Sequence, residues 1–203
     1  MSVFFVTEEG VVKKVEAKSF ADVRRSGIIA INLKGKDKLV SANHAQDGDS
    51  VSIVTSKGQS IRFDEADVRA MGRTAGGVKG MTIKKGDSVV SAEVVSAAAK
   101  TGTLLVIMSK GYGKKTELDE YKVQGRGGSG IKTAEVTPKT GEIIGAKVLL
   151  DEADKEGEIV VISKKGQVIR TGTAEIPSLS RATQGVRIMK MREGDSIASM
   201  VAL

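Results

Sequence analysis

Basic side chains recur at a fixed distance from glycines along this sequence, in a pattern suited to binding a row of phosphates. Four residues after each of four glycines stands a lysine or arginine, namely Lys14, Arg62, Lys115 and Arg170. Ammonium and guanidinium groups donate charge-assisted hydrogen bonds to phosphate oxygens. The spacing therefore points first to recognition of a polyanion.

A second set of cations belongs to a motif in which Arg stands four residues before Gly, which is followed by Val or Ile and then by Lys or Arg. The motif spans residues 73–79, 126–132 and 181–187, and supplies Arg73, Lys79, Arg126, Lys132, Arg181 and Arg187. A looser first copy places Arg24 and Arg25 just before Gly27. The two sets together predict a binding surface that repeats along the chain.

The elements that must position these cations are short β-hairpins. An apolar run ends in a polar turn containing Gly10, Gly58, Gly111 or Gly166, and each turn leads into a second extended run. Glycine suits such turns because it adopts positive φ without strain. The key glycine of the second motif follows 19 residues later in three of the four copies.

Each repeat of about fifty residues is predicted to hold four antiparallel strands, the size of one propeller-type blade. In the second repeat the expected strands are Val51–Thr55, Ser60–Phe63, Val78–Lys84 and Val89–Val95. Short helical turns are expected at Asp64–Arg69 and Leu118–Tyr121. We expect one repeat domain over residues 1–203, with blades at about 1–48, 49–100, 101–155 and 156–203, joined by loops at Asn43–Asp49, Ala97–Gly102 and Asp151–Gly157.

An acidic residue recurs ten residues after the glycine of the second motif. It is Asp37, Asp87 and Asp195 in three copies, whereas the third copy reads Thr140-Gly141-Glu142. Each acid opens another β-rich run.

The composition favours the same class. Glycine accounts for 24 of 203 residues, aromatic residues for only 3%, and the apolar residues are mostly Val, Ile, Leu and Ala. Many β-branched residues, many glycines and two prolines predict an all-β protein.

Several chemistries are excluded by residue counts. The absence of cysteine rules out disulfides and thiolate metal sites, and the single histidine rules out a site built on several imidazoles. The net charge of +7, with no leader and no membrane-length apolar run, predicts a basic cytoplasmic protein. We expect no catalytic residue, no cofactor and no metal.

Strand alternation around Arg62 and Arg170 predicts that their side chains face solvent, while Lys13 and Lys114 depart from this alternation. If rotation relates the repeats, equivalent cations form one curved basic rim, as a duplex requires for backbone contacts. The alternative is that these cations only solubilise exposed strands and protect sheet edges.

The four repeats resemble the blades of the C-terminal domain of DNA gyrase A, the β-pinwheel. The resemblance is carried by segments starting at Arg24 (RRSGIIAINLKGKDKLVSA), Ile61 (IRFDEADVRAMGRTAGGVKGM), Tyr121 (YKVQGRGGSGIKTAEVTPKTGEI) and Ile162 (ISKKGQVIRTGTAEIPSLSRATQGVRIMKM), and it covers essentially the whole chain.

This resemblance implies an open arc of four blades, the last four of a six-blade fold, with strands passed between neighbouring blades. It also implies double-stranded DNA bent or wrapped around a basic outer rim. In the parent topoisomerase the domain would support negative supercoiling beside the breakage–reunion part of gyrase A and the gyrase B protein. It would be non-catalytic, and its location would be the cytoplasm, associated with the nucleoid.

The family's hallmark heptad is Gln-Arg-Arg-Gly-Gly-Lys-Gly, and residues 124–130 here read QGRGGSG. Gly125 and Ser129 replace an Arg and the Lys, so the role of Gln124 and Arg126 carries over in part. These departures weaken the expectation that the chain wraps DNA fully. Binding of the DNA backbone by the rest of the rim is still expected. The alternative for this segment is a glycine-rich turn between blades.

Three other functions are alternatives to this one. The equivalent domain of topoisomerase IV has fewer blades and would suit the same repeats. A propeller scaffold that binds acidic proteins would use the same basic rim. An enzyme with a site in a central channel would need convergent catalytic groups, which the sequence lacks.

Overall fold

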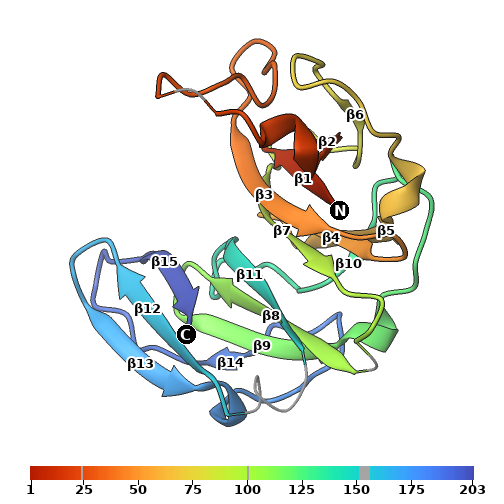
Figure 1. The fold of residues 1–203 in the computed structure, drawn as a ribbon. Helices are drawn as coiled ribbons and strands as arrows, with labels where there is room; N and C mark the ends of the chain where they lie inside the picture. The colour runs from red at the N-terminus through yellow and green to blue at the C-terminus, as the bar shows by residue number, and fades with distance from the viewer. Residues whose placement is uncertain (24, 100, 151–155) are drawn as a thin grey trace.

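The computed structural model describes residues 1–23, 25–99, 101–150 and 156–203. These residues fold into four antiparallel sheets of three or four short strands, which follow one another around an open arc (Figure 1). The all-β prediction is confirmed.

The first three sheets have four strands each. The first has the order β3-β1-β2-β6, with β1 (Ser2–Thr7), β2 (Val11–Glu16), β3 (Leu39–Ala45) and β6 (Val78–Lys79). The second has the order β10-β5-β4-β7, with β4 (Ser50–Thr55), β5 (Gln59–Asp64), β7 (Val89–Val95) and β10 (Ile131–Lys132). The third has the order β11-β8-β9-β14, with β8 (Gly102–Met108), β9 (Tyr112–Glu117), β11 (Ile143–Leu150) and β14 (Val186–Arg187).

The fourth sheet has three strands within the described residues. Its order is β13-β12-β15, with β12 (Glu158–Ser163), β13 (Val168–Gly172) and β15 (Ile197–Ala202). Short 3-10 helices follow the second strand of each hairpin, namely η1 (Ala17–Phe20), η2 (Glu65–Asp67), η3 (Leu118–Glu120) and η5 (Thr173–Glu175). The turns predicted at Asp64–Arg69 and Leu118–Tyr121 are therefore present as η2 and η3.

The hairpin glycines have the conformation that their turns were predicted to need. Gly10, Gly58, Gly111 and Gly166 have φ between 80° and 86°. Each donates its N–H to the carbonyl three residues earlier, closing the turn.

Neighbouring sheets exchange strands. The outer strands β6, β10 and β14 each come from the repeat that follows the one they complete. β6 pairs with β2 across 66 residues, through Val12↔Val78 and Val11↔Lys79. After Lys79 the strand stops because the N–H groups of Gly80 and Met81 both turn to the carbonyl of Gly10, at 2.9 and 3.1 Å. The expectation of a strand over Val78–Lys84 is therefore wrong beyond Lys79.

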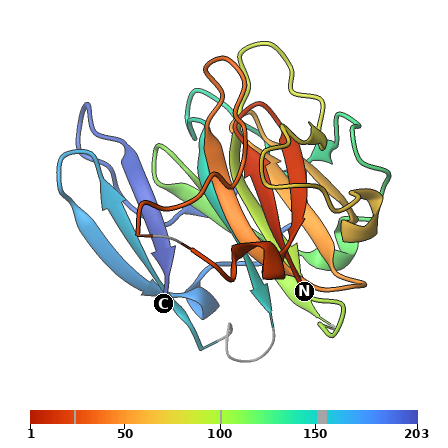
Figure 2. The same ribbon diagram turned by 45° about the horizontal axis from the view of Figure 1, so that its top comes forward.

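The apolar core lies between consecutive sheets, not inside one. Three clusters each combine side chains of two successive repeats, such as Phe4 with Phe63, Met108 with Val54, and Leu105 with Ile159. The inner strands β3, β7, β11 and β15 follow one another along the concave side, with β7 packed between β3 and β11. Figure 2 shows the sheets stacked side by side in this order.

One predicted loop differs from the structure. β3 extends to Ala45, so the joint predicted at Asn43–Asp49 begins after Ala45. Most of the predicted joint Asp151–Gly157 lies outside the described residues. Among the described residues, no helix combines the length and apolar character needed to span a bilayer.

Candidate nucleic-acid interface

The outer strands carry three repeat-equivalent cations to the convex edge of the arc. Lys79 on β6, Lys132 on β10 and Arg187 on β14 are all exposed. In the part of the chain that the structure describes, none of the three lies within 4.0 Å of a carboxylate oxygen. Their charges are therefore available to an external anion.

The arginines of the second motif join successive copies of that motif. The Nη1 atom of each donates to a backbone carbonyl at the equivalent position of the preceding repeat: Arg73 to Ile29 at 3.3 Å, Arg126 to Lys79 at 2.8 Å, and Arg181 to Lys132 at 3.1 Å. The guanidinium groups of Arg126 and Arg181 thus lie beside the outer strands β6 and β10, whereas the acceptor of Arg73 lies in a loop. The arrangement places Arg126 next to Lys79, and Arg181 next to Lys132.

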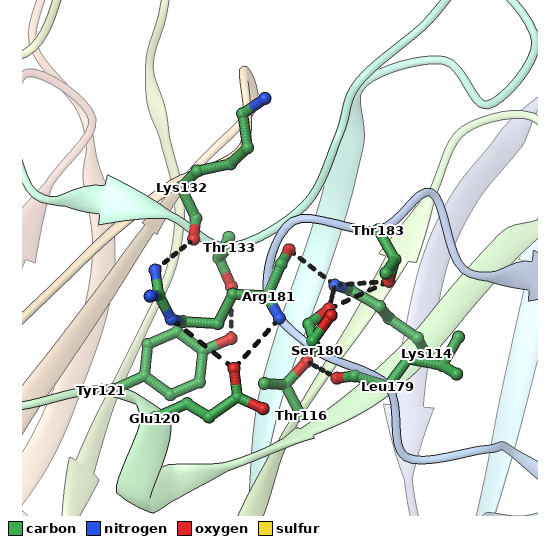
Figure 3. Close-up of polar contacts among 10 residues, drawn as sticks. All are labelled: Lys114, Thr116, Glu120, Tyr121, Lys132, Thr133, Leu179, Ser180, Arg181 and Thr183. Carbon is green, nitrogen blue, oxygen red and sulfur yellow. Dashed lines mark hydrogen bonds and ion pairs between the residues drawn. The ribbon is translucent and has the colours of Figure 1, made fainter.

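Both of these arginines are held by further contacts. Arg126 donates Nε–H to the carbonyl of Asp67 at 2.9 Å. Arg181 forms an ion pair with Glu120, Nε to Oε2 at 3.7 Å, and its backbone N–H donates to the same carboxylate at 3.2 Å (Figure 3). Because one carboxylate offsets its charge, Arg181 presents less net positive potential than Arg126.

Two lysines that depart from strand alternation are buried beneath this line of motifs. The Nζ of Lys114 donates to the carbonyls of Ser180 and Arg181 at 2.6 and 2.7 Å, and to Thr183 Oγ1 at 3.0 Å (Figure 3). Lys13 makes the equivalent contact with the carbonyl of Arg73, and also donates to the carbonyl of Ala30 at 2.9 Å. Both side chains are 0% exposed.

Burial changes the acidity of these ammonium groups. Desolvation, together with the nearby Arg181 charge, lowers the pKa of Lys114 from 10.5 to about 8, against the opposing effect of Glu120. Desolvation first, and then the Arg73 charge, also lowers the pKa of Lys13. The second and fourth repeats carry Ile61 and Ile169 at the equivalent position. The fold itself therefore accepts an apolar side chain at this position. The role of the two lysines is to fix the loops whose carbonyl groups accept their hydrogen bonds.

Three of the four cations in the first set lie at the junctions between repeats. Lys14 is only 13% exposed and pairs with Glu65, Nζ to Oε2 at 2.5 Å. Arg62 donates from Nη1 to the carbonyl of Leu118 at 3.2 Å and from Nε to Ser50 Oγ at 2.9 Å. Partial burial lowers the pKa of Arg62, which opposes a weaker effect of Asp64.

The expectation that Arg62 faces solvent is therefore wrong, because the next repeat covers that face of β5. Lys14 is covered in the same way. Lys115 is half-buried, and its backbone bonds to the carbonyl of Pro177 and the N–H of Leu179. Arg170 is exposed as predicted, but it forms an ion pair with Glu158. Lys14, Arg62 and Lys115 are thus separate from the exposed outer edge.

Two predicted residues belong to the first copy of the second motif. Arg25 is exposed in the loop before Gly27. Arg24 lies outside the described residues.

The segment that resembles the hallmark heptad packs as a turn between the second and third repeats. Gln124 donates its backbone N–H to the carbonyl of Arg62 at 2.7 Å, and Gly127 to the carbonyl of Gly80 at 2.6 Å. Gly130 has φ +73°, and a Cβ there would lie 2.4 Å from the carbonyl of Ser60. The glycines therefore permit close packing, while Arg126 remains at the exposed surface.

Sequence reasoning missed a further group of exposed cations near the hairpin turns. It comprises Lys34, Lys36, Lys84, Lys85, Lys110, Lys139, Lys190 and Arg192. The recurring acid is the sequence feature that could have located this group. Asp87 and Asp195 accept backbone N–H bonds from the turn residues Lys57 and Lys165, and thereby anchor the loops that carry these cations. In the third repeat the buried Thr140, not Glu142, occupies this place, and its carbonyl accepts the N–H of Lys110.

Comparison with known proteins gives a consistent result over the whole chain. The family described as DNA gyrase C-terminal domain, beta-propeller matches four times, at residues 2–44, 49–96, 103–149 and 157–203. The DNA gyrase A protein of Mycolicibacterium smegmatis is 40% identical over 196 residues, which are 96% of this chain and 22% of that protein. The DNA gyrase A protein of Lawsonia intracellularis is 39% identical over 190 residues, 94% of this chain and 23% of that protein.

Two solved structures share the architecture. A DNA gyrase A C-terminal domain aligns with a TM-score of 0.85 at 25% identity, over 99% of this chain and 65% of that one. The C-terminal domain of a DNA topoisomerase IV aligns with a TM-score of 0.89 at 26% identity, over 100% of this chain and 61% of that one. The chain spans about a fifth of the length of the curated relatives. From its repeats, strand exchange and these matches, the chain belongs to the β-propeller family of DNA gyrase A C-terminal domains.

Proposed function

We propose that this chain binds and bends duplex DNA without sequence preference, as a non-catalytic module of a type II topoisomerase. The observation that carries the proposal is the line of exposed cations on successive outer strands. Lys79 and Lys132 each stand beside the arginine of the next repeat, and Arg187 continues the line. A convex row of cations contacts many phosphates and reads few bases.

The remaining predicted residues contribute to this surface to different degrees. Arg25, Arg73 and Gln124 belong to the same motif loops, and we assign them to the edge of the DNA path. Lys14, Arg62, Lys115 and Arg170 support the junctions or are paired, so we assign them a weaker, indirect role. In the parent enzyme, the breakage–reunion part of gyrase A and the gyrase B protein would perform strand passage, in the cytoplasm at the nucleoid.

A salt titration tests the proposal. For a duplex of arbitrary sequence, log affinity should fall linearly with log salt, with a slope of about −0.9 for each phosphate contacted. Lys79→Gln with Lys132→Gln should make the slope shallower by about 2, equally for different sequences. A control with the same charge change, Lys18→Gln with Lys147→Gln, removes two lysines already paired with Glu16 and Glu93 and should leave the slope unchanged. Equal slopes for the two double variants would place the DNA elsewhere.

A topoisomerase IV module is the second candidate, because the topoisomerase IV domain superimposes with a TM-score of 0.89. The two functions differ in whether the bound DNA acquires chirally constrained writhe. A nicked minicircle is resealed in the presence of the chain, and the linking number of the sealed product measures this property. Writhe of one sign supports the gyrase-type function, and bending without net writhe supports the topoisomerase IV type.

A further inference from the structure

A hollow of about 580 Å³ lies beside Tyr112, where the β8–β9 turn meets the fourth repeat. Its walls come from the third and fourth repeats, and nearly all of their charged groups are basic. The lining residues are Lys110, Tyr112, Lys139, Arg187, Lys190, Met191, Arg192, Gly194 and Asp195. Its volume falls within the range of small-ligand sites.

The positive charge of this hollow is not neutralised by the protein. Five cations face one carboxylate, and among the described residues none of the five forms an ion pair. The carboxylate is engaged elsewhere, since Asp195 accepts Ser163 Oγ–H at 2.6 Å and the N–H groups of Lys165 and Ser196 at 3.1 and 2.8 Å. Cations held together without counter-charges repel one another and attract a multivalent anion.

Tyr112 organises two of the cations. Lys139 Nζ lies 5.5 Å and Arg187 Cζ 5.7 Å from the centroid of its ring, and Arg187 donates to its hydroxyl oxygen at 3.3 Å. The hydrogen bond from Arg187 is the largest effect and lowers the pKa of Tyr112. Desolvation comes next and opposes it, and the charges of Arg187 and Lys139 lower the pKa further. The ring itself is buried, so it provides a fixed platform for both cations.

The equivalent hollows at the other junctions have different charges. At the first junction the hollow of about 740 Å³ is lined by Glu8, Glu9, Asp37 and Asp87 against only Lys34 and Lys79. At the second, Lys57 pairs with Glu142. The fold therefore does not require the charge found around Tyr112.

We propose that the Tyr112 hollow binds a group of two or more linked phosphates. Linked phosphates offer several oxygens and several negative charges, which suits a hollow lined by Arg187, Arg192 and three lysines. Two sources carry this chemistry, a free oligophosphate and the backbone of a bound nucleic acid. The hollow shares Arg187 with the convex edge and is otherwise independent of Lys79 and Lys132.

Calorimetric titration of the full chain with inorganic pyrophosphate and tripolyphosphate, at constant ionic strength, tests the free source. A double variant, Lys110→Glu with Lys190→Thr, introduces the residues found at the equivalent positions of the first junction's hollow, Glu9 and Thr82. We expect its affinity for tripolyphosphate to be at least about tenfold weaker, because charge-assisted contacts are lost. The control, Lys122→Glu with Lys36→Thr, makes the same charge change at exposed lysines outside the hollow and should bind as the wild type does.

The NMR signals of Tyr112 supply a second readout, since a bound anion offsets the cations and should raise the pKa of this phenol. Tight tripolyphosphate binding that only the hollow variant weakens supports a free oligophosphate. Weakened duplex binding by that variant alone, without tripolyphosphate binding, assigns the linked phosphates to DNA. If the hollow and control variants match for both ligands, the site proposal is overturned. Lys79→Gln with Lys132→Gln should leave tripolyphosphate binding unchanged, so failure of the DNA proposal is seen separately.

Discussion

The Nζ atom of Lys114 lies 2.7 Å from the carbonyl oxygen of Arg181, so a buried ammonium holds the backbone of a residue whose guanidinium reaches the outer edge. Lys13 has the same relationship to Arg73 two repeats earlier. In both places a charge inside the protein fixes the loop that presents a charge outside it.

Replacing this ammonium should destabilise the protein. Lys114→Met keeps a long flexible side chain but leaves the oxygens of Ser180, Arg181 and Thr183 without their shared donor, at a cost of about 1–3 kcal/mol in the free energy of unfolding. Urea denaturation measures this loss. Ile61→Met, at the equivalent position of the second repeat, is the control and should cost less than about 1.5 kcal/mol. Equal losses would mean that the ammonium contributes only its packing.

The same lysine should give the stability a pH dependence. Because its pKa is lowered to about 8 in the folded chain and is 10.5 otherwise, the unfolded state binds more protons between these values. Relative to Lys114→Met, the wild type should therefore gain stability as pH rises from 8 to 10.5, with no difference in slope below about pH 7. Denaturant midpoints of both proteins across this range provide the measurement. A wild-type stability that falls relative to the variant would show that the three oxygens outweigh desolvation.

Two hairpin glycines should respond differently to alanine. At Gly166 (φ +82°) a Cβ meets nothing within 4 Å, so Gly166→Ala should cost only the left-handed backbone strain of about 1–2 kcal/mol. At Gly111 (φ +86°) the Cβ would lie 2.0 Å from the carbonyl of Met189, which follows the exchanged strand β14. Gly111→Ala should therefore cost clearly more, and amide exchange of Ile188 and Met189 should accelerate. Similar thermal midpoints for the two variants would argue against this role of the exchanged strand.

Structural and electrostatic roles of Arg126 can be separated. Arg126→Lys and Arg126→Gln both lose the paired bonds to the carbonyls of Asp67 and Lys79, so both should lower stability by a similar amount, about 1 kcal/mol. Only Arg126→Gln removes the charge, so only that variant should make the salt slope of duplex binding shallower, by about 0.9. Fluorescence anisotropy at several salt concentrations distinguishes them. A lysine variant with the reduced slope would indicate that geometry, not charge, carries the DNA contact.

Much of the fold could be predicted from the sequence because its signals are local. The turn at Gly58 needs positive φ, and the apolar runs on either side have the length of a strand. The same pattern occurs in all four repeats, which strengthens the prediction. The end of β6 at Lys79 was not predictable, because Gly80 and Met81 leave the strand to reach a carbonyl about seventy residues away.

The interface was predicted in part for a similar reason. Alternation along β5 correctly places Arg62 on the opposite face from Ile61 and Phe63. It cannot show that the next repeat covers Arg62, because that contact joins residues far apart in the sequence. The buried role of Lys114 had a usable signal, since aligned repeats alternate between lysine and isoleucine there. That alternation indicates an apolar environment, in which an ammonium needs oxygen partners.

The exchange of outer strands makes each of the first three repeats dependent on its successor. A lesion in residues 78–79 removes an edge from the first sheet while originating in the second, so damage to one unit is felt by two. Solenoid repeats often unfold progressively from their ends, whereas we expect these repeats, joined by exchanged strands, to unfold together in a single transition. Because β6, β10 and β14 are hydrogen-bonded into the neighbouring sheets, we also expect the distance between consecutive blades to change little when force is applied to the domain.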